Sequence, residues 1–181
     1  MTPRSILVVT DFSELGGHAL ARAALLGAEH RAALQLVYLS APGEVPPPDV
    51  AVRLSHHALQ LRQRHQIAVQ AVSRVDCTVA DIARAAAAHD LVVWGTAPQR
   101  GLRAWWGTHP ALHLLRACQR PVVVVRNAAD QTYQSLLVAV DLSQASHRLV
   151  ELGLAHHPRA RVELFHAIGT ANEGKLRYAE V

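Results

Sequence analysis

The 181-residue chain has few cysteines, few aromatic residues, a single lysine and no long apolar run. Its two cysteines, Cys77 and Cys118, are too few for a disulfide scaffold and are typical of a reducing compartment. No apolar run approaches the ~20 residues that a membrane helix needs, and the N-terminal residues lack the apolar stretch of a signal peptide. We therefore expect a cytoplasmic protein without membrane contact.

Aromatic side chains make up only 4% of the residues, whereas 50% of the residues are hydrophobic. This composition excludes a mainly disordered chain and predicts a core of Ala, Val and Leu. The net charge is +4, and Lys175 is the only lysine, so the positive charge is almost entirely arginine. These arginines are scattered along the predicted helices, without a basic run or interleaved aromatics. We therefore expect no nucleic-acid partner.

Short β-branched runs alternate with longer Ala/Leu segments of helical period. The predicted strands cover residues 5–10, 33–39, 67–75, 91–94 and 121–126. The helices between them are predicted at residues 13–30, 49–66, 78–89 and 108–117, with Ser13 and Thr78 as N-caps. This order implies right-handed crossovers. The fold class is therefore α/β, an open five-stranded parallel sheet with helices on both faces.

An internal repeat follows this first domain. Residues 135–143 (SLLVAVDLS) repeat residues 5–13 (SILVVTDFS) at an offset of 130, with five identical positions. A helix and a strand at residues 162–167 are expected to follow. We predict one domain over residues 1–128 and an incomplete second copy over residues 133–181. The chain is then either a fragment of a tandem protein, or this second unit docks on the first domain or on a partner.

Ligands of an open parallel sheet bind beyond the carboxyl ends of the strands, where the strand order reverses. Three segments are predicted to converge there, residues 10–13, 38–40 and 95–108. Asp11 can accept hydrogen bonds from a base or a ribose, although a role as a cap for the following helix fits it equally well. The glycines of residues 95–108, followed by Thr108 and a helix, allow a backbone to approach phosphate closely. Asp141 is the equivalent of Asp11 in the second copy, which has no glycine-containing phosphate loop, so we expect only a structural role for Asp141.

The runs ILVVTDFSE, DLVVWGT, GLRAWWGT and RPVVVVR together resemble the universal stress protein (UspA-type) family over the first ~128 residues. The resemblance implies a Rossmann-like five-stranded parallel sheet, dimerisation through the last strand and, in one subgroup, ATP bound at the strand ends. It also implies contacts of ATP or another adenine nucleotide with ten residues. These are Thr10, Asp11, Phe12, Val37, Trp94, Gly95, Ala97, Gly101, Gly107 and Thr108.

The phosphate motif of that subgroup is a glycine, two residues, a glycine, nine residues, then glycine and Ser or Thr. Gly95 and the Gly107–Thr108 pair match it, but Pro98 stands at the second glycine and eight residues follow instead of nine. Proline removes a backbone N–H and a positive φ. The resemblance therefore implies contacts with the nucleoside part of ATP more strongly than contacts with its triphosphate.

Two functions remain open at this stage. One is a stress-response binding and signalling module with a degenerate phosphate loop, which acts through dimerisation and partner contacts. The other is a sensor of ATP or another adenine nucleotide. No nucleophile elbow and no metal-ligand spacing is present, so we expect weak ATPase activity at most and no metal site. The apolar edge over residues 122–125 predicts a homodimer.

Overall fold

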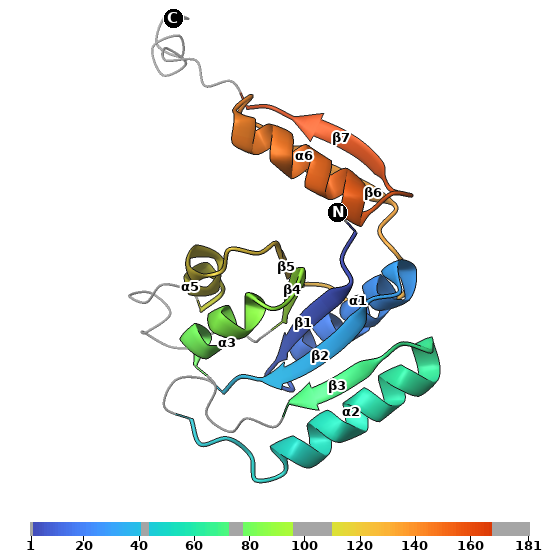
Figure 1. The fold of residues 1–181 in the computed structure, drawn as a ribbon, viewed down its shortest axis with the longest axis vertical. Coiled ribbons are helices and arrows are strands. Elements are labelled where there is room, and N and C mark those ends of the chain that lie inside the picture. The colour runs from blue at the N-terminus through green and yellow to red at the C-terminus, as the bar shows by residue number, and fades with distance from the viewer. Residues whose placement is uncertain (1, 41–43, 73–77, 96–109, 168–181) are drawn as a thin grey trace, which may run out of the picture. The chain divides into compact units, whose positions relative to one another are not determined.

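The computed structural model describes residues 2–40, 44–72, 78–95 and 110–167 (Figure 1). The chain divides into two compact units, residues 2–132 and the residues from Tyr133 onward, and each unit is described by itself. Within the described ranges, no helix has both the length and the apolar character needed to cross a membrane.

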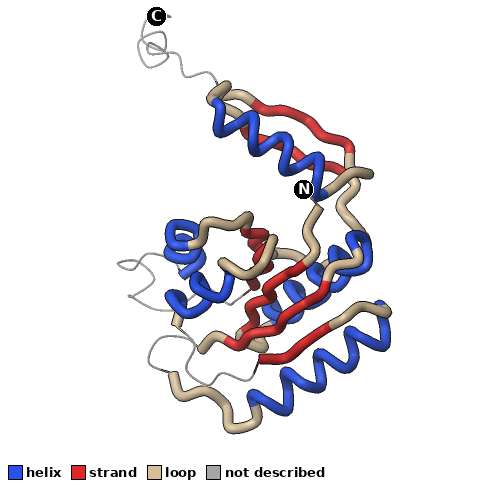
Figure 2. The backbone as a smooth tube through the Cα atoms, in the orientation of Figure 1, coloured by secondary structure: helices blue, strands red, loops and turns tan. Residues whose placement is uncertain are grey.

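The first unit contains a five-stranded sheet in the order β3-β2-β1-β4-β5, with every neighbouring pair parallel (Figure 2). The α/β fold class predicted from the sequence is confirmed. The strands are β1 (Ser5–Thr10), β2 (Ala33–Tyr38), β3 (Val69–Val72), β4 (Leu91–Gly95) and β5 (Val122–Val124). The helices are α1 (Glu14–His30), α2 (Val50–His65), α3 (Val79–Ala86) and α5 (Pro110–Ala117).

Side chains of β1 alternate between two separate cores. Ile6 and Val8 pack with residues of α1 and α2, whereas Leu7 and Val9 pack with residues of α3 and α5. This alternation follows from the period of two along a strand, and it places α1 and α2 on one face of the sheet and α3 and α5 on the other (Figure 1). All four of these β1 residues are fully buried.

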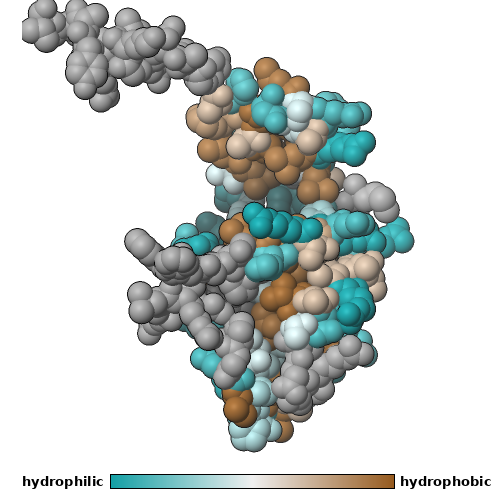
Figure 3. All heavy atoms as spheres, turned by 90° about the vertical axis from the view of Figure 1, so that its left-hand side faces the viewer, coloured by the Kyte–Doolittle hydropathy of each residue, from teal (hydrophilic) through white to brown (hydrophobic). Residues whose placement is uncertain are grey.

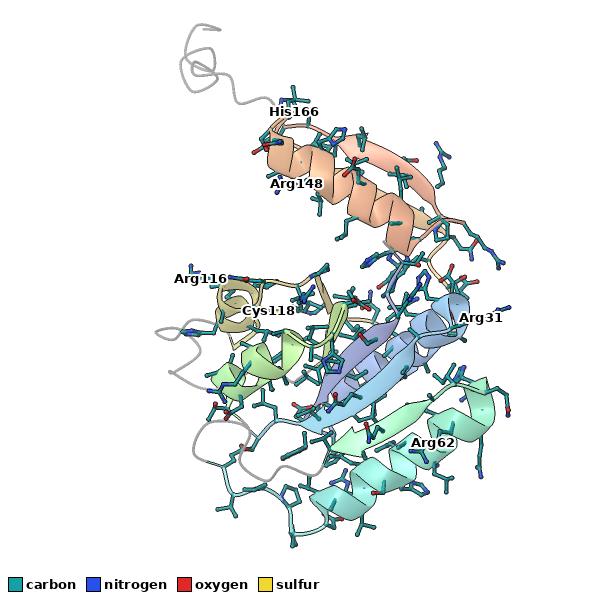
Figure 4. All side chains as sticks on the ribbon, viewed as in Figure 1. Arg31, Arg62, Arg116, Cys118, Arg148 and His166 are labelled. Carbon is teal, nitrogen blue, oxygen red and sulfur yellow. The ribbon has the colours of Figure 1, made fainter. Side chains whose placement is uncertain are left out.

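Helix α1 begins at the predicted cap, because the Ser13 hydroxyl accepts a hydrogen bond from the Gly16 N–H at 3.2 Å. The residues that α1 buries are mostly small, so its backbone can approach the sheet closely; they are Gly16, Ala19, Leu20, Ala23, Ala24, Leu26 and Gly27. Thr78 also caps α3 as predicted, in a capping box with Asp81. On the face that α1 and α2 cover, Arg62 of α2 donates from Nε to the carbonyl of Val69 at 2.6 Å (Figure 4).

Two strands of the first unit are shorter than the sequence predicts by several residues. β3 is four residues long instead of nine, although residues 73–77 lie outside the described part of the chain. β5 is three residues long instead of six, and it pairs with Val92–Trp94 of β4.

The second unit repeats the opening of the first. It contains β6 (Ser135–Ala139), α6 (Gln144–His156) and β7 (Arg161–Phe165). β6 and β7 pair in parallel with Ser135 opposite Arg161, as β1 and β2 pair with Ser5 opposite Ala33. The internal repeat in the sequence is thus a repeat of β-α-β structure.

Candidate functional site

The carboxyl ends of β1, β2 and β4 lie in one row. Thr10 of β1 is opposite Tyr38 of β2 on one side and Gly95 of β4 on the other. From β1 the chain proceeds outward to β2 and β3, then crosses back to β4 on the other side of β1. The strand order therefore reverses at β1, which is where an open parallel sheet offers a crevice for a ligand.

A tight turn joins β1 to α1 at this edge. Asp11 Oδ1 accepts hydrogen bonds from the N–H of Ser13 at 2.9 Å and from the Ser13 hydroxyl. Thr10 is fully buried, and its hydroxyl oxygen accepts from the N–H of Phe12 at 3.1 Å. Phe12 has a φ of 60°, in the left-handed region that non-glycine residues rarely adopt. The N-cap of α1 is therefore Ser13 and not Asp11, whose half-buried carboxylate instead holds Ser13 in the turn at the strand ends.

The Phe12 ring lies in a cluster of aromatic and cationic side chains from β2 and α2. It stacks on Tyr38, with ring centroids 4.8 Å apart, and lies 5.9 Å from the ring of His57. The guanidinium carbon of Arg53 lies 4.1 Å from the Phe12 ring centroid, within the range of a cation–π contact. These contacts fix the side chain of Phe12 and bring a positive charge from α2 close to the turn.

Two pKa shifts describe the electrostatics of this cluster. Burial raises the pKa of Tyr38, and the carboxylates of Asp11 and Glu44 raise it further. Burial lowers the pKa of His57, and the neighbouring His56 and Arg53 lower it further. Tyr38 is therefore a neutral phenol and His57 a neutral imidazole at pH 7, so Arg53 is the permanent cation of the cluster.

Gly95 is required by packing at the end of β4. A Cβ at this position would lie 2.2 Å from the carbonyl oxygen of Leu15 and 2.5 Å from Cβ of Ala19, both on α1. Gly16 is constrained in the same way, because its Cβ would lie 2.4 Å from Oγ1 of Thr10. The start of α1 thus rests directly on the ends of β1 and β4, which accounts for both glycines without a ligand.

The two remaining described site residues, Val37 and Trp94, lie on the α3/α5 side. Trp94 is 1% exposed and packs with Ile82 and Leu114, and its indole Nε1 has no hydrogen-bond partner among the described residues. Cys118 belongs to the same core and is buried as an unpaired thiol (Figure 4).

A shallow groove runs along this face beside Val37. It lies between β2, β3 and the first turns of α3, and its lining includes Gln35, Val72, Ile82 and the ion pair of Asp81 with Arg84. Two hydrogen bonds from Thr78 and one from Arg84 lower the pKa of Asp81 to about 2, so this carboxylate stays ionised above that pH. An apolar floor with a polar rim is suited to a planar heterocycle.

Of the ten residues predicted for nucleotide contact, Thr10, Asp11, Phe12 and Gly95 lie at the strand-end edge, whereas the side chains of Val37 and Trp94 belong to the core on the α3/α5 face. The other four, Ala97, Gly101, Gly107 and Thr108, lie outside the described residues, as does Pro98. Sequence reasoning missed Arg53 and Gly16. The pair of glycines in the first turn of a helix was a usable signal for Gly16, whereas nothing in the sequence placed Arg53 beside Phe12.

The open parallel sheet with helices on both faces defines the class as a doubly wound α/β protein. The family model described as the universal stress protein family matches residues 3–126, which is 124 of the 181 residues. The chain belongs to the universal stress protein family. No curated protein has significant sequence similarity to it.

Solved structures agree on the fold. A universal stress protein from Archaeoglobus fulgidus DSM 4304 superposes with a TM-score of 0.74 at 13% identity, covering 98% of this chain and 70% of its own. A functionally unknown protein from Pseudomonas aeruginosa PAO1 is 26% identical with a TM-score of 0.66, over 92% of this chain and 61% of its own. A universal stress protein solved in complex with cAMP has a TM-score of 0.59 at 17% identity, over 71% of this chain and all of its own. The chain thus spans less than two thirds of the length of the Pseudomonas protein.

Proposed function

We propose that the first unit binds an adenine nucleotide at the carboxyl edge of the sheet and acts as a stress-response sensor rather than as an enzyme. In this proposal the protein recognises the nucleotide mainly through contacts with its base and ribose. The observation that carries this proposal is the row formed by Thr10, Tyr38 and Gly95, which sets Asp11 at the reversal of strand order.

Two further observations support binding mainly through the base and ribose of the nucleotide. The groove beside Val37 offers an apolar floor of the kind that holds a base. The structural neighbour in complex with cAMP shares the fold of this unit, and cAMP carries one phosphate rather than three. A small anion fits the sequence better than a triphosphate does, because Pro98 replaces a glycine of the phosphate motif.

Replacing Asp11 by alanine tests the site. A ligand at a hundred times its Kd stabilises its protein by about 2.7 kcal/mol, so cAMP, AMP or ATP should raise the Tm of the natural chain by roughly 5–10 °C. We expect Asp11→Ala to remove that rise, because the carboxylate is lost from the strand ends. The measurement is differential scanning fluorimetry with each nucleotide separately.

Asp141→Ala is the matched control. Asp141 accepts the same hydrogen bond in the second copy, from the N–H of Ser143 at 3.0 Å, so both variants lose an equivalent turn. Only the Asp11 variant should lose the nucleotide-induced rise in Tm. If none of the three nucleotides raises the Tm of the natural chain at millimolar concentration, the proposal is wrong.

A second candidate function is supported by the edge strand β5. This strand lies at the end of the sheet, and Val124 is 39% exposed on it. An apolar edge of this kind pairs readily with another strand. The unit would then act as an interaction module, as a homodimer through residues 122–125 with protein partners still to be identified.

Light scattering tests this pairing. We expect a dimer at tens of micromolar, and Val124→Lys should shift it to a monomer because it places a charge in the paired edge. Val52→Lys is the control, since Val52 is 71% exposed on α2, away from β5. A clean monomer of the natural chain at this concentration would exclude dimerisation through β5.

A further inference from the structure

Strand β3 forms one edge of the five-stranded sheet, and the residues of this strand give the edge little protection. The strand order places β3 outermost, with β2 as its one neighbour. Residues 67–72 (IAVQAV) contain no charged residue and no proline, and half of them are β-branched. An uncharged, β-branched segment at an open edge pairs readily with another strand. Such an edge needs protection from elsewhere in the chain.

The hydrogen bonds of β3 show which of its backbone groups face outward. The N–H of Leu34 on β2 donates to the carbonyl of Ala68 at 2.8 Å, so Ala68 and Gln70 direct their backbone groups toward β2. Because alternate residues of a paired strand face opposite sides, the backbone groups of Val69 and Ala71 point away from the sheet. A further strand would bond to these two residues.

One of these outward groups is already occupied. Arg62, in the last turn of α2, donates from Nε to the carbonyl oxygen of Val69 at 2.6 Å (Figure 4). Arg62 forms no ion pair with any carboxylate in the part of the chain that the structure describes. Its guanidinium is therefore available to this backbone carbonyl. Of the two outward carbonyls in the described part of β3, that of Ala71 then remains open.

The position of Arg62 follows from the short connection between α2 and β3. Helix α2 ends at His65, and β3 begins at Val69. Between them, Gln66 has a φ of 55°, in the left-handed region that ends a helix and turns the chain back. The last turn of α2 consequently lies beside the first residue of β3, and the contact depends only on this local connection.

Polar side chains on a surface do not protect a strand edge in the same way. Figure 3 shows hydrophilic residues of the first unit interspersed with apolar ones on the face in view. Such mixing discourages contact between side chains, but an edge strand bonds through its backbone. A guanidinium on an edge carbonyl blocks that bond itself, and it adds a charge that an incoming strand must displace.

We propose that Arg62 closes the β3 edge and prevents β3 from pairing with β3 of a second copy of the chain. Pairing about a two-fold axis would meet Arg62 of both copies, so each such contact would break two hydrogen bonds to Val69. The consequence concerns the whole sheet, because β5 is the opposite edge. A chain with both edges open to self-pairing forms open-ended assemblies instead of closed dimers.

Arg62→Met tests the proposal, because methionine keeps an apolar stem but has no donor, and Arg62 is exposed, so folding is at little risk. The full-length chain is studied by analytical ultracentrifugation from micromolar to submillimolar concentration, in a Val124→Lys background so that β5 does not contribute. Loss of two charge-assisted hydrogen bonds should tighten self-association at least about a hundredfold. Hydrogen exchange at the Ala71 amide should slow as the dimer forms.

Two further variants make the test specific. Arg64→Met removes the same charge from an exposed position of the same helix, and this chain should remain monomeric. Gln70 is exposed on β3, so adding Gln70→Lys to Arg62→Met places a charge at the new contact and should restore the monomer. A purely structural role of Arg62 would lower the free energy of unfolding of Arg62→Met without changing its mass in solution.

Three results would overturn the proposal. The first is an Arg62→Met chain that stays monomeric over the whole concentration range. The second is equal self-association of the Arg64→Met chain, which would assign the effect to net charge. The third is a dimer whose formation leaves hydrogen exchange at Ala71 unchanged, since its contact would then lie away from β3.

Discussion

Replacing Gly95 by alanine is expected to destabilise the first unit by about 3 kcal/mol. The added Cβ would lie 2.2 Å from the carbonyl oxygen of Leu15, which is backbone and cannot rotate away. Relief therefore requires the start of α1 to move off the strand ends, which also displaces the turn at Asp11. Urea denaturation followed by circular dichroism measures the loss as a lower midpoint with an unchanged slope.

Gly17→Ala is the matched control for this substitution. Gly17 is exposed on the same helix, and its Cβ would meet no atom within 4 Å. Alanine is favoured over glycine inside a helix, so this variant should gain about 0.5–1 kcal/mol. A Gly95→Ala variant as stable as the natural chain would show that β4 and α1 are not in tight contact.

Trp94→Ala should have an effect of similar size for a different reason. Trp94 is 1% exposed and fills the core between the sheet and the helices α3 and α5. Truncation to alanine removes a large buried side chain and leaves a cavity, at a cost of about 3–5 kcal/mol. Thermal or urea unfolding of the purified variant measures this loss.

The Trp94→Phe variant distinguishes a packing role of the indole from a role in nucleotide binding. The indole Nε1 of Trp94 has no hydrogen-bond partner among the described residues, so phenylalanine loses volume but no hydrogen bond to that part of the chain. We expect a much smaller loss of stability than for alanine, and an unchanged rise in Tm on adding nucleotide. A loss of that rise with the fold retained would show that the indole contacts the ligand.

Local signals in the sequence were sufficient for most of the fold. A buried apolar run, a serine cap and an alanine-rich segment predict β1 and α1, because each depends only on neighbouring residues. The repeat at an offset of 130 likewise predicts β6 and α6, since equal local patterns give equal local structure. The strand order was not predicted, because the handedness of a crossover sets the face that it covers and not which strands become neighbours.

The candidate site was less accessible to such reasoning. Asp11 and Val37 could be placed at the strand ends, because carboxyl ends of parallel strands share one edge. The approach of Arg53 to Phe12 depends on how α2 packs across the sheet, which no local pattern encodes. The packing role of Gly95 was also hidden, because a glycine that faces a helix and one that faces a phosphate look the same in a sequence.

The left-handed turn after β1 has a consequence for how such sites arise. The same turn recurs after β6, where Leu142 has a φ of 63° and a side chain that is 79% exposed. Stacking on Tyr38 and Arg53 is therefore not what holds Phe12 in this conformation. The aspartate and the serine two residues later are common to both turns, and in each the serine N–H donates to the aspartate Oδ1. The geometry is thus a portable local module, which can be duplicated with its strand and helix before any ligand or partner has been acquired.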